Sequence, residues 1–93
     1  MFYNAFNAPF YQWFEMPEVK IYSTPTCVYC RLAKQYFSDN GVKYVEYNVA
    51  DDYDKAVEMF EKSGQQGVPV IDVNGKIIVG FDKPAIKGAL GLK

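Results

Sequence analysis

The chain contains two cysteines, Cys27 and Cys30, with two residues between them. Thiols at this spacing can hold a metal ion, form a structural disulfide, or work together in thiol–disulfide exchange. A zinc site needs four ligands, and the chain has neither a histidine nor a second cysteine pair. A disulfide across so short a loop removes little unfolded-state entropy and does not persist in a reducing compartment. Redox exchange is therefore favoured over these two alternatives.

The residues after Cys27 have the spacing of a helix over residues 27–39. Its apolar residues fall on one face: Val28, Leu32, Ala33, Tyr36 and Phe37. Cys27 thus stands at a helix N-terminus, where free backbone N–H groups and aligned peptide dipoles favour negative charge. We expect Cys27 to be held as the nucleophilic thiolate. Cys30 lies one turn later, less exposed and close enough to close a disulfide.

The other elements are predicted from periodicity and turn residues. We expect strands over residues 19–22, 42–48, 68–73 and 76–79, and helices over residues 27–39 and from Asp82 to about Leu90. A helix between them is expected to have Asp51 and Asp52 at its N-cap or in its first turn and to end near Ser63-Gly64. Asn74-Gly75 suits a type I′ hairpin turn, and Asp82 suits the cap of the last helix. The middle helix is expected to bury one stripe: Tyr53, Ala56, Val57 and Phe60.

This order, βαβαββα, predicts a mixed α/β fold. A right-handed crossover makes the first two strands parallel, and the hairpin adds an antiparallel pair. The result is a four-stranded sheet with helices on both faces. A C-x-x-C pair beside a βαβ unit is typical of the thioredoxin-like redox fold.

Composition narrows the classes further. Ninety-three residues, 49% hydrophobic and 23% charged, suit one small domain. A net charge of −1 without a basic run argues against nucleic acid or acidic lipid as partner. Neither a membrane-spanning run nor a signal peptide is present, so a cytoplasmic location is expected.

Residues 1–15 differ from the rest, and residues 16–93 form the predicted domain. Seven aromatic residues crowd this first stretch, whose only charge is Glu15. Phenylalanines recur every four residues, which would gather them on one side of a helix, although Pro9 argues against a continuous one. One hypothesis is an appended or grafted peptide. The other is a native extension that buries its rings against the domain, in the groove of a partner or at a membrane interface. If the rings are exposed, this extension would mediate self-association or partner binding.

Three segments together resemble the glutaredoxin family. They are residues 22–30 (YSTPTCVYC), 67–70 (GVPV) and 79–82 (VGFD), and the likeness runs from Val19 to about Leu90. Within the family the chain looks most like the small bacterial glutaredoxin-like redoxins that include the NrdH type. The resemblance implies a thioredoxin-like fold and a catalytic pair formed by Cys27 and Cys30.

The resemblance also implies a substrate-binding surface around the pair. It makes the Val68–Pro69 peptide cis and places it beside Cys27, with the Val68 backbone open to pair with a substrate. Thr26 belongs to the active-site loop, and Tyr29 matches an aromatic residue that packs beside the bound peptide or glutathione. Val28 stands where relatives commonly have proline.

The resemblance also implies glutathione binding, although two positions differ from the family's glutathione-binding motif. Gly80 and Asp82 match positions that hold the γ-glutamyl end, but Val79 replaces a glycine. Thr24 replaces a basic residue common in the family, and Arg31 is a candidate substitute cation. Glutathione is thus a candidate ligand or reductant, with a flavin-dependent reductase as the other candidate electron donor.

The predicted function is thiol–disulfide oxidoreduction. Cys27 attacks the disulfide of a protein substrate, which in NrdH-like relatives includes ribonucleotide reductase, and Cys30 resolves the mixed disulfide. Two alternatives remain: monothiol deglutathionylation through Cys27 alone, and an iron–sulfur carrier that bridges a cluster between two subunits. No metal is expected in the dithiol form.

Overall fold

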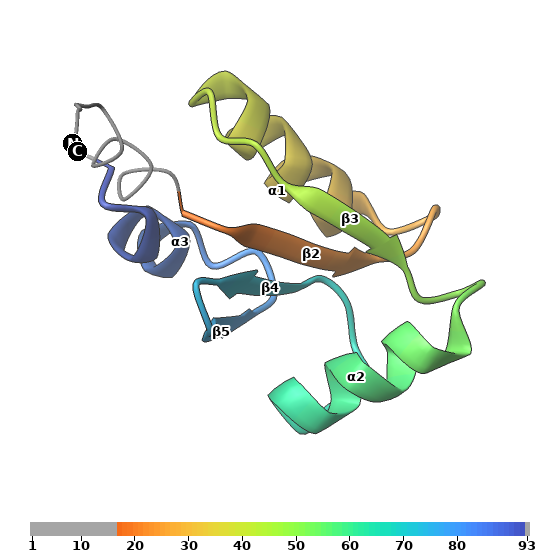
Figure 1. Cartoon of the computed structure of the whole chain (residues 1–93). Helices are drawn as coiled ribbons and strands as arrows, with labels where there is room; N and C mark the ends of the chain where they lie inside the picture. The colour runs from red at the N-terminus through yellow and green to blue at the C-terminus, as the bar shows by residue number, and fades with distance from the viewer. Residues whose placement is uncertain (1–16, 93) are drawn as a thin grey trace, which may run out of the picture.

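A computed structural model describes residues 17–92 of the chain. The predictions made for residues 1–15 lie outside this range. The described elements, in chain order, are β2 (Val19–Ser23), α1 (Val28–Asp39), β3 (Val45–Asn48), α2 (Tyr53–Ser63), β4 (Val70–Val73), β5 (Lys76–Val79) and α3 (Lys83–Leu90) (Figure 1).

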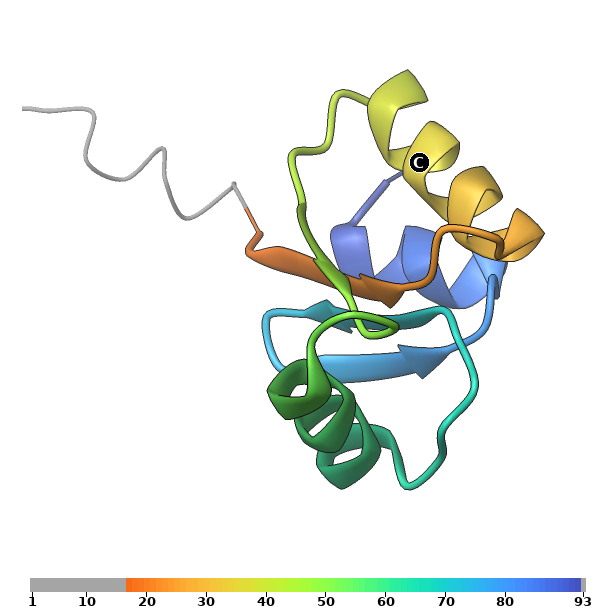
Figure 2. The same ribbon diagram turned by 90° about the vertical axis from the view of Figure 1, so that its right-hand side faces the viewer.

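The strands form one mixed sheet in the order β3-β2-β4-β5. β2 and β3 are parallel, whereas β4 is antiparallel to both β2 and β5. Figure 2 shows α1 and α3 together on one face of the sheet and α2 on the other. The predicted thioredoxin-like fold is confirmed.

Two apolar clusters hold these layers together, and β2 contributes to both by alternation of its side chains. Val19 and Ile21 point into the larger cluster, where Ala33 and Phe37 of α1 and Ile86 of α3 cover the sheet. Tyr22 points the other way, into a smaller cluster with Met59 of α2 and Val70.

Two strands are shorter than the sequence predicts. β3 begins at Val45 and not at residue 42, because the chain around Val42 completes the end of α1. Gly41 has φ +67°, and the Val42 N–H donates to the Phe37 carbonyl at 2.8 Å. This is the closing bond of a helix C-cap, which points the backbone away from the ladder. β4 begins at Val70, two residues later than predicted.

The buried face of α1 also differs from the prediction. Cys30, Ala33 and Phe37 are fully buried, whereas Val28 is 55% and Leu32 44% exposed. Cys30 lies on the same face of the helix as Ala33 and Phe37, which pack with the sheet and with Ile86 of α3. The cysteine takes a core position that the apolar pattern had assigned to its neighbours.

The predicted buried stripe of α2 is wrong in three of its four members. Tyr53, Val57 and Phe60 are all exposed, Tyr53 to 79%, while Ala56 is partly buried and Met59 is the buried residue of this helix. The reason is on the sheet, where the hydroxyl of Tyr22 and the carboxylate of Asp72 need polar partners. Glu58 and Lys62 of α2 supply them.

The hairpin and the last helix are as predicted. Asn74 (φ 52°) and Gly75 (φ 93°) form the two-residue connection between β4 and β5. Positive φ at both positions is what a type I′ turn requires. Among residues 17–92, no helix has the length and apolar character needed to cross a membrane.

Candidate active site

The three sequence motifs meet at one end of the sheet. β2 ends at Ser23 and leads into the loop before Cys27. Tyr22 is paired with Val70, so the segment just before β4 lies at this same end. Val70 is paired in turn with Val79, which brings Gly80 there as well. Strand register therefore gathers segments that are about forty to fifty residues apart in sequence.

Cys27 is the N-cap residue of α1. Its Sγ accepts a hydrogen bond from the Cys30 N–H at 3.0 Å, one of the backbone donors that a helix start leaves free. The Cys27 N–H donates to the Thr24 carbonyl at 3.3 Å, which closes the turn before the helix. The Cys27 side chain remains partly exposed. The thiol thus lies where the helix stabilises negative charge and where a substrate can reach it.

Cys30 has a contrasting environment, because it is fully buried. Burial, followed by its hydrogen bond with Cys27, raises the pKa of the Cys30 thiol to about 12. The backbone of Thr24 and the charge of Lys34 act in the opposite direction. The two thiols are both free in this structure. The Cys27 thiol is partly accessible, whereas the Cys30 thiol is buried and protonated at neutral pH.

The ladder between β2 and β4 stops short of the site. Tyr22 pairs with Val70, and at the far end the Asn74 N–H donates to the Glu18 carbonyl. Continuing this alternation, the next hydrogen-bonded pair would be Thr24 with Val68. It does not form, and the backbone of Val68 makes no hydrogen bond within residues 17–92. An extended peptide can pair with these groups.

The loop that carries Val68 is held from its other side. Pro69 is buried, and the Val68–Pro69 peptide is cis. The Pro69 carbonyl accepts a hydrogen bond from the Gly80 N–H at 2.8 Å. Gly80 has φ +81°, a conformation that a residue with a Cβ adopts at a cost. Gly80 therefore supports the loop, in addition to its place in the predicted glutathione site.

The first turn of α1 presents an apolar surface next to Cys27. Tyr29 is 62% exposed and adjoins the exposed Val28 and Leu32. Arg31 and Thr26 are exposed as well. This surface can contact the apolar side chains of a polypeptide, and Arg31 provides a positive charge beside it.

Asp82 and Val79 bear on the predicted glutathione site. Asp82 is the N-cap of α3, and its Oδ1 accepts a hydrogen bond from the Ala85 N–H at 3.2 Å. That oxygen is already engaged within the chain, which leaves the second one for a ligand. Val79, 45% exposed, stands where the family has a glycine. Within residues 17–92 no cluster of histidine, cysteine or acidic side chains is arranged to bind a metal ion.

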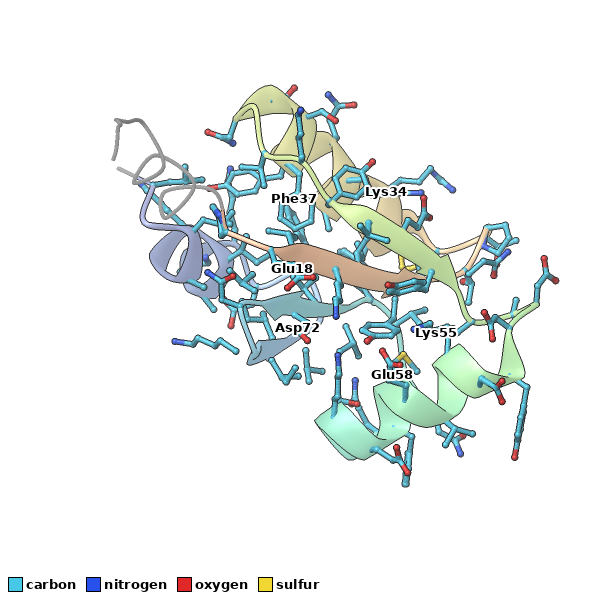
Figure 3. The ribbon with its side chains drawn as sticks, viewed as in Figure 1. Glu18, Lys34, Phe37, Lys55, Glu58 and Asp72 are labelled. Carbon is cyan, nitrogen blue, oxygen red and sulfur yellow. The ribbon has the colours of Figure 1, made fainter. Side chains whose placement is uncertain are left out.

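One group near the site was not predicted from the sequence. Lys34 lies one helical turn after Cys30, and its Nζ is 2.7 Å from Oε2 of Glu46 on β3. The same oxygen accepts a hydrogen bond from the buried Ser23 hydroxyl at 2.6 Å. These contacts tether a cation on the Cys30 side of α1, and Figure 3 shows Lys34 above β3. The i, i+4 spacing of Cys30 and Lys34 is the signal that could have revealed it.

A second polar cluster fixes α2 to the sheet. The buried Tyr22 hydroxyl donates to Glu58 and accepts from Lys62 at 2.9 Å. Lys62 also lies 2.8 Å from Asp72, and the Glu58 carboxylate contacts Lys55 at 3.1 Å. Figure 3 shows Lys55 and Glu58 between α2 and the sheet. The Tyr22 hydroxyl and then Lys55 lower the pKa of Glu58 to about 2.

The fold and the site define a class. A thioredoxin-like fold with two free cysteines at the start of α1 is typical of thiol redox proteins. The chain belongs to the glutaredoxin family, because the Glutaredoxin family model matches residues 19–78. The family and the fold support a thiol–disulfide redox function.

The similarity to individual proteins agrees with this family assignment. An uncharacterized glutaredoxin-like protein encoded in the rubredoxin operon of Clostridium pasteurianum is 50% identical over 68 residues, 73% of this chain and 91% of that protein. Glutaredoxin 3 of Escherichia coli K12 is 37% identical over 67 residues, 72% of this chain and 81% of the relative. The structure is also similar to methanoredoxin of Methanosarcina acetivorans, with TM-score 0.76 and 25% identity over 83% of this chain and 87% of that one.

Proposed function

We propose that this chain reduces disulfides of polypeptide substrates through Cys27 and Cys30. The observation that carries the proposal is the contrast between the two thiols. Cys27 is accessible and accepts a helix N–H, whereas Cys30 is buried and its pKa is raised to about 12. An attacking thiolate and a resolving thiol need these two environments.

The reaction proceeds by two exchanges. The Cys27 thiolate attacks one sulfur of the substrate disulfide, forms a mixed disulfide, and releases the other substrate sulfur as a thiolate. Cys30 loses its proton and attacks the Cys27 sulfur, which releases the second substrate thiolate. The substrate disulfide gains two electrons, the leaving thiolates take up two protons, and the Cys27–Cys30 disulfide forms.

The environment of Cys30 supports an order in which Cys27 attacks first and Cys30 reacts second. Part of what raises the pKa of Cys30 is its hydrogen bond with Cys27 and the charge on that sulfur. When Cys27 becomes part of a mixed disulfide, its sulfur is neutral and this contribution disappears. Cys30 is then ionised more easily, at the moment when its attack is needed.

Substrate recognition would use the open edge beside the cysteines. The free backbone groups of Val68 accept a short extended strand, as in β-augmentation. Tyr29 and its exposed apolar neighbours contact side chains next to the substrate disulfide. Such a surface favours polypeptides over a small thiol.

The electron donor is either glutathione or a flavin-dependent reductase. A cytoplasmic compartment contains both donors, and we keep it as the proposed location. Asp82 retains one free carboxylate oxygen for glutathione, and Arg31 is an exposed cation. Val79 and Thr24 remove two features that relatives use for this ligand. We therefore infer that turnover depends less on glutathione than in relatives with the full motif.

Two single-cysteine variants test the proposal. Cys27→Ser should abolish reduction of insulin disulfides and of a glutathionylated peptide. Cys30→Ser should lose insulin reduction and accumulate the mixed disulfide, detectable by mass spectrometry. Undiminished insulin reduction by Cys30→Ser would contradict the dithiol mechanism.

The same variants separate the alternatives. If Cys30→Ser retains full turnover of the glutathionylated peptide, the monothiol route holds for that substrate. The iron–sulfur alternative uses Cys27 of each of two subunits, with glutathione. Anaerobic reconstitution followed by visible absorption tests it, and a colourless monomer would contradict it.

A further inference from the structure

The described chain starts at the wall of a groove that no described residue fills. The groove has a volume of about 190 Å³. Its walls are Pro17, the loop of residues 40–43 after α1, and Leu90 and Leu92 at the end of α3. We call it the α1–α3 groove. Its lining is mainly apolar, and Lys43 is exposed at its rim.

The alternation of β2 continues into this groove. Val19 and Ile21 point to the α1–α3 side of the sheet, and Tyr22 points to the α2 side. Pro17, two residues before Val19, lines the groove on the α1–α3 side. Because a proline restricts the preceding residue to extended conformations, the same alternation is favoured one step further upstream. A chain extended over residues 13–16 would bring residues 15 and 13 to the side of Pro17.

Those two residues are Glu15 and Trp13. Trp13 is four residues from Pro17, so the two Cα atoms are at most about 14 Å apart. Glu15 is the only charged residue among the first sixteen. Lys43 is in none of the ion pairs within residues 17–92. An apolar groove with a cation at its rim thus lies within reach of an aromatic ring followed by an anion.

We propose that Trp13 occupies the α1–α3 groove and that Glu15 pairs with Lys43 at its rim. This assigns residues 13–16 to an intramolecular contact that covers the ends of α1 and α3. The contact lies at the opposite end of β2 from Cys27, so it does not depend on the proposed redox function. Removing it should leave disulfide reduction intact.

Another groove provides a matched control. It lies on the far face of the sheet, along α2, with a volume of about 410 Å³ and the exposed rings of Tyr53 and Phe60 in its lining. The same extended geometry would bring residues 14 and 16, rather than Trp13, to that face. Docking of Trp13 there is an outcome that the experiment distinguishes.

Trp13 is the only tryptophan of the chain, so its fluorescence reports on the proposed contact directly. In the full chain we expect a blue-shifted emission and acrylamide quenching several-fold weaker than in urea. Leu92→Asp should bring the quenching close to the urea value. Phe60→Asp, the control on α2, should leave it unchanged. Far-UV circular dichroism would verify that both variants are folded.

A charge exchange tests the rim independently of Leu92. Lys43→Glu should increase quenching of Trp13, and the double variant Glu15→Lys with Lys43→Glu should restore the shielding. Quenching of the wild-type chain as strong as in urea would overturn the proposal. So would shielding that Phe60→Asp removes, which would indicate the α2 groove, or shielding that grows with protein concentration, which would indicate a second copy of the chain.

Discussion

Selective alkylation of the two thiols follows directly from their burial. Burial and the neighbouring Cys27 raise the pKa of Cys30 from an ordinary 9.0 to about 12. At neutral pH this lowers the thiolate fraction by about three orders of magnitude, since each pKa unit is a factor of ten. Because the thiolate is the reactive form, Cys30 should react with iodoacetamide about a thousandfold more slowly than an ordinary thiol.

The assay is pulsed alkylation of the reduced chain at pH 7, with the sites identified by peptide mass spectrometry and free cysteine as the reference. We expect a single adduct on Cys27 over the period in which free cysteine is consumed. In urea both residues should be labelled. Cys27→Ser should speed the labelling of Cys30, because the charge of Cys27 is removed, but burial should keep it slower than free cysteine. A native Cys30 rate within tenfold of free cysteine would refute the reasoning.

Three further predictions concern the polar clusters. Lys62→Met leaves the buried Asp72 without its ion-pair partner and should cost about 2–4 kcal/mol in urea unfolding. Lys55→Met loses a contact to the more exposed Glu58 and the position of its ammonium over the Tyr47 ring, and should cost less, about 1 kcal/mol. Equal costs would contradict the buried pair. The pKa of Glu58 is about 2 in the folded chain, below its ordinary 4.5, so its stabilisation is present above pH 4.5 and is lost as pH falls toward 2. The stability difference between wild type and Glu58→Gln should therefore shrink over that window, and a constant difference would count against it. Lys34→Met removes a positive charge that lowers the pKa of Cys30, so Cys30 should resolve the mixed disulfide up to about tenfold more slowly. Lys34→Arg keeps the charge and should resolve it at a rate near that of the wild type. An unchanged rate for Lys34→Met in single-turnover experiments would exclude this role.

Local sequence was sufficient for the order and type of the elements and for the position of the cysteine pair at a helix start. Cys27 at a helix start, Asn74-Gly75 in a hairpin and Asp82 as a cap depend on contacts within a few residues. Such contacts follow from backbone geometry and side-chain type, whatever the rest of the fold does. The element order, with the handedness of the crossover, then determined the sheet topology.

The faces of the helices depended on distant residues. On α2, an apolar stripe and a polar stripe competed for the sheet. The polar stripe faces the sheet because Tyr22 and Asp72 require hydrogen bonds. These two residues are 36 and 10 residues away in sequence from their partners on α2. No periodicity within α2 contains this information. The ion pair between Lys34 and Glu46 could not be predicted either, because its two residues come from different elements.

What the sequence determined by itself is the reactive unit: two thiols three residues apart at the N-terminus of a helix. What only the tertiary structure decided is their difference. Cys30 becomes buried because it lies on the face of α1 that packs into the core through Ala33 and Phe37. Within residues 17–92, the ladder between β2 and β4 ends before Val68 and leaves the Val68 backbone groups without hydrogen bonds. Local sequence places the pair at the helix start, and packing between segments far apart in the chain leaves one thiol accessible and buries the other.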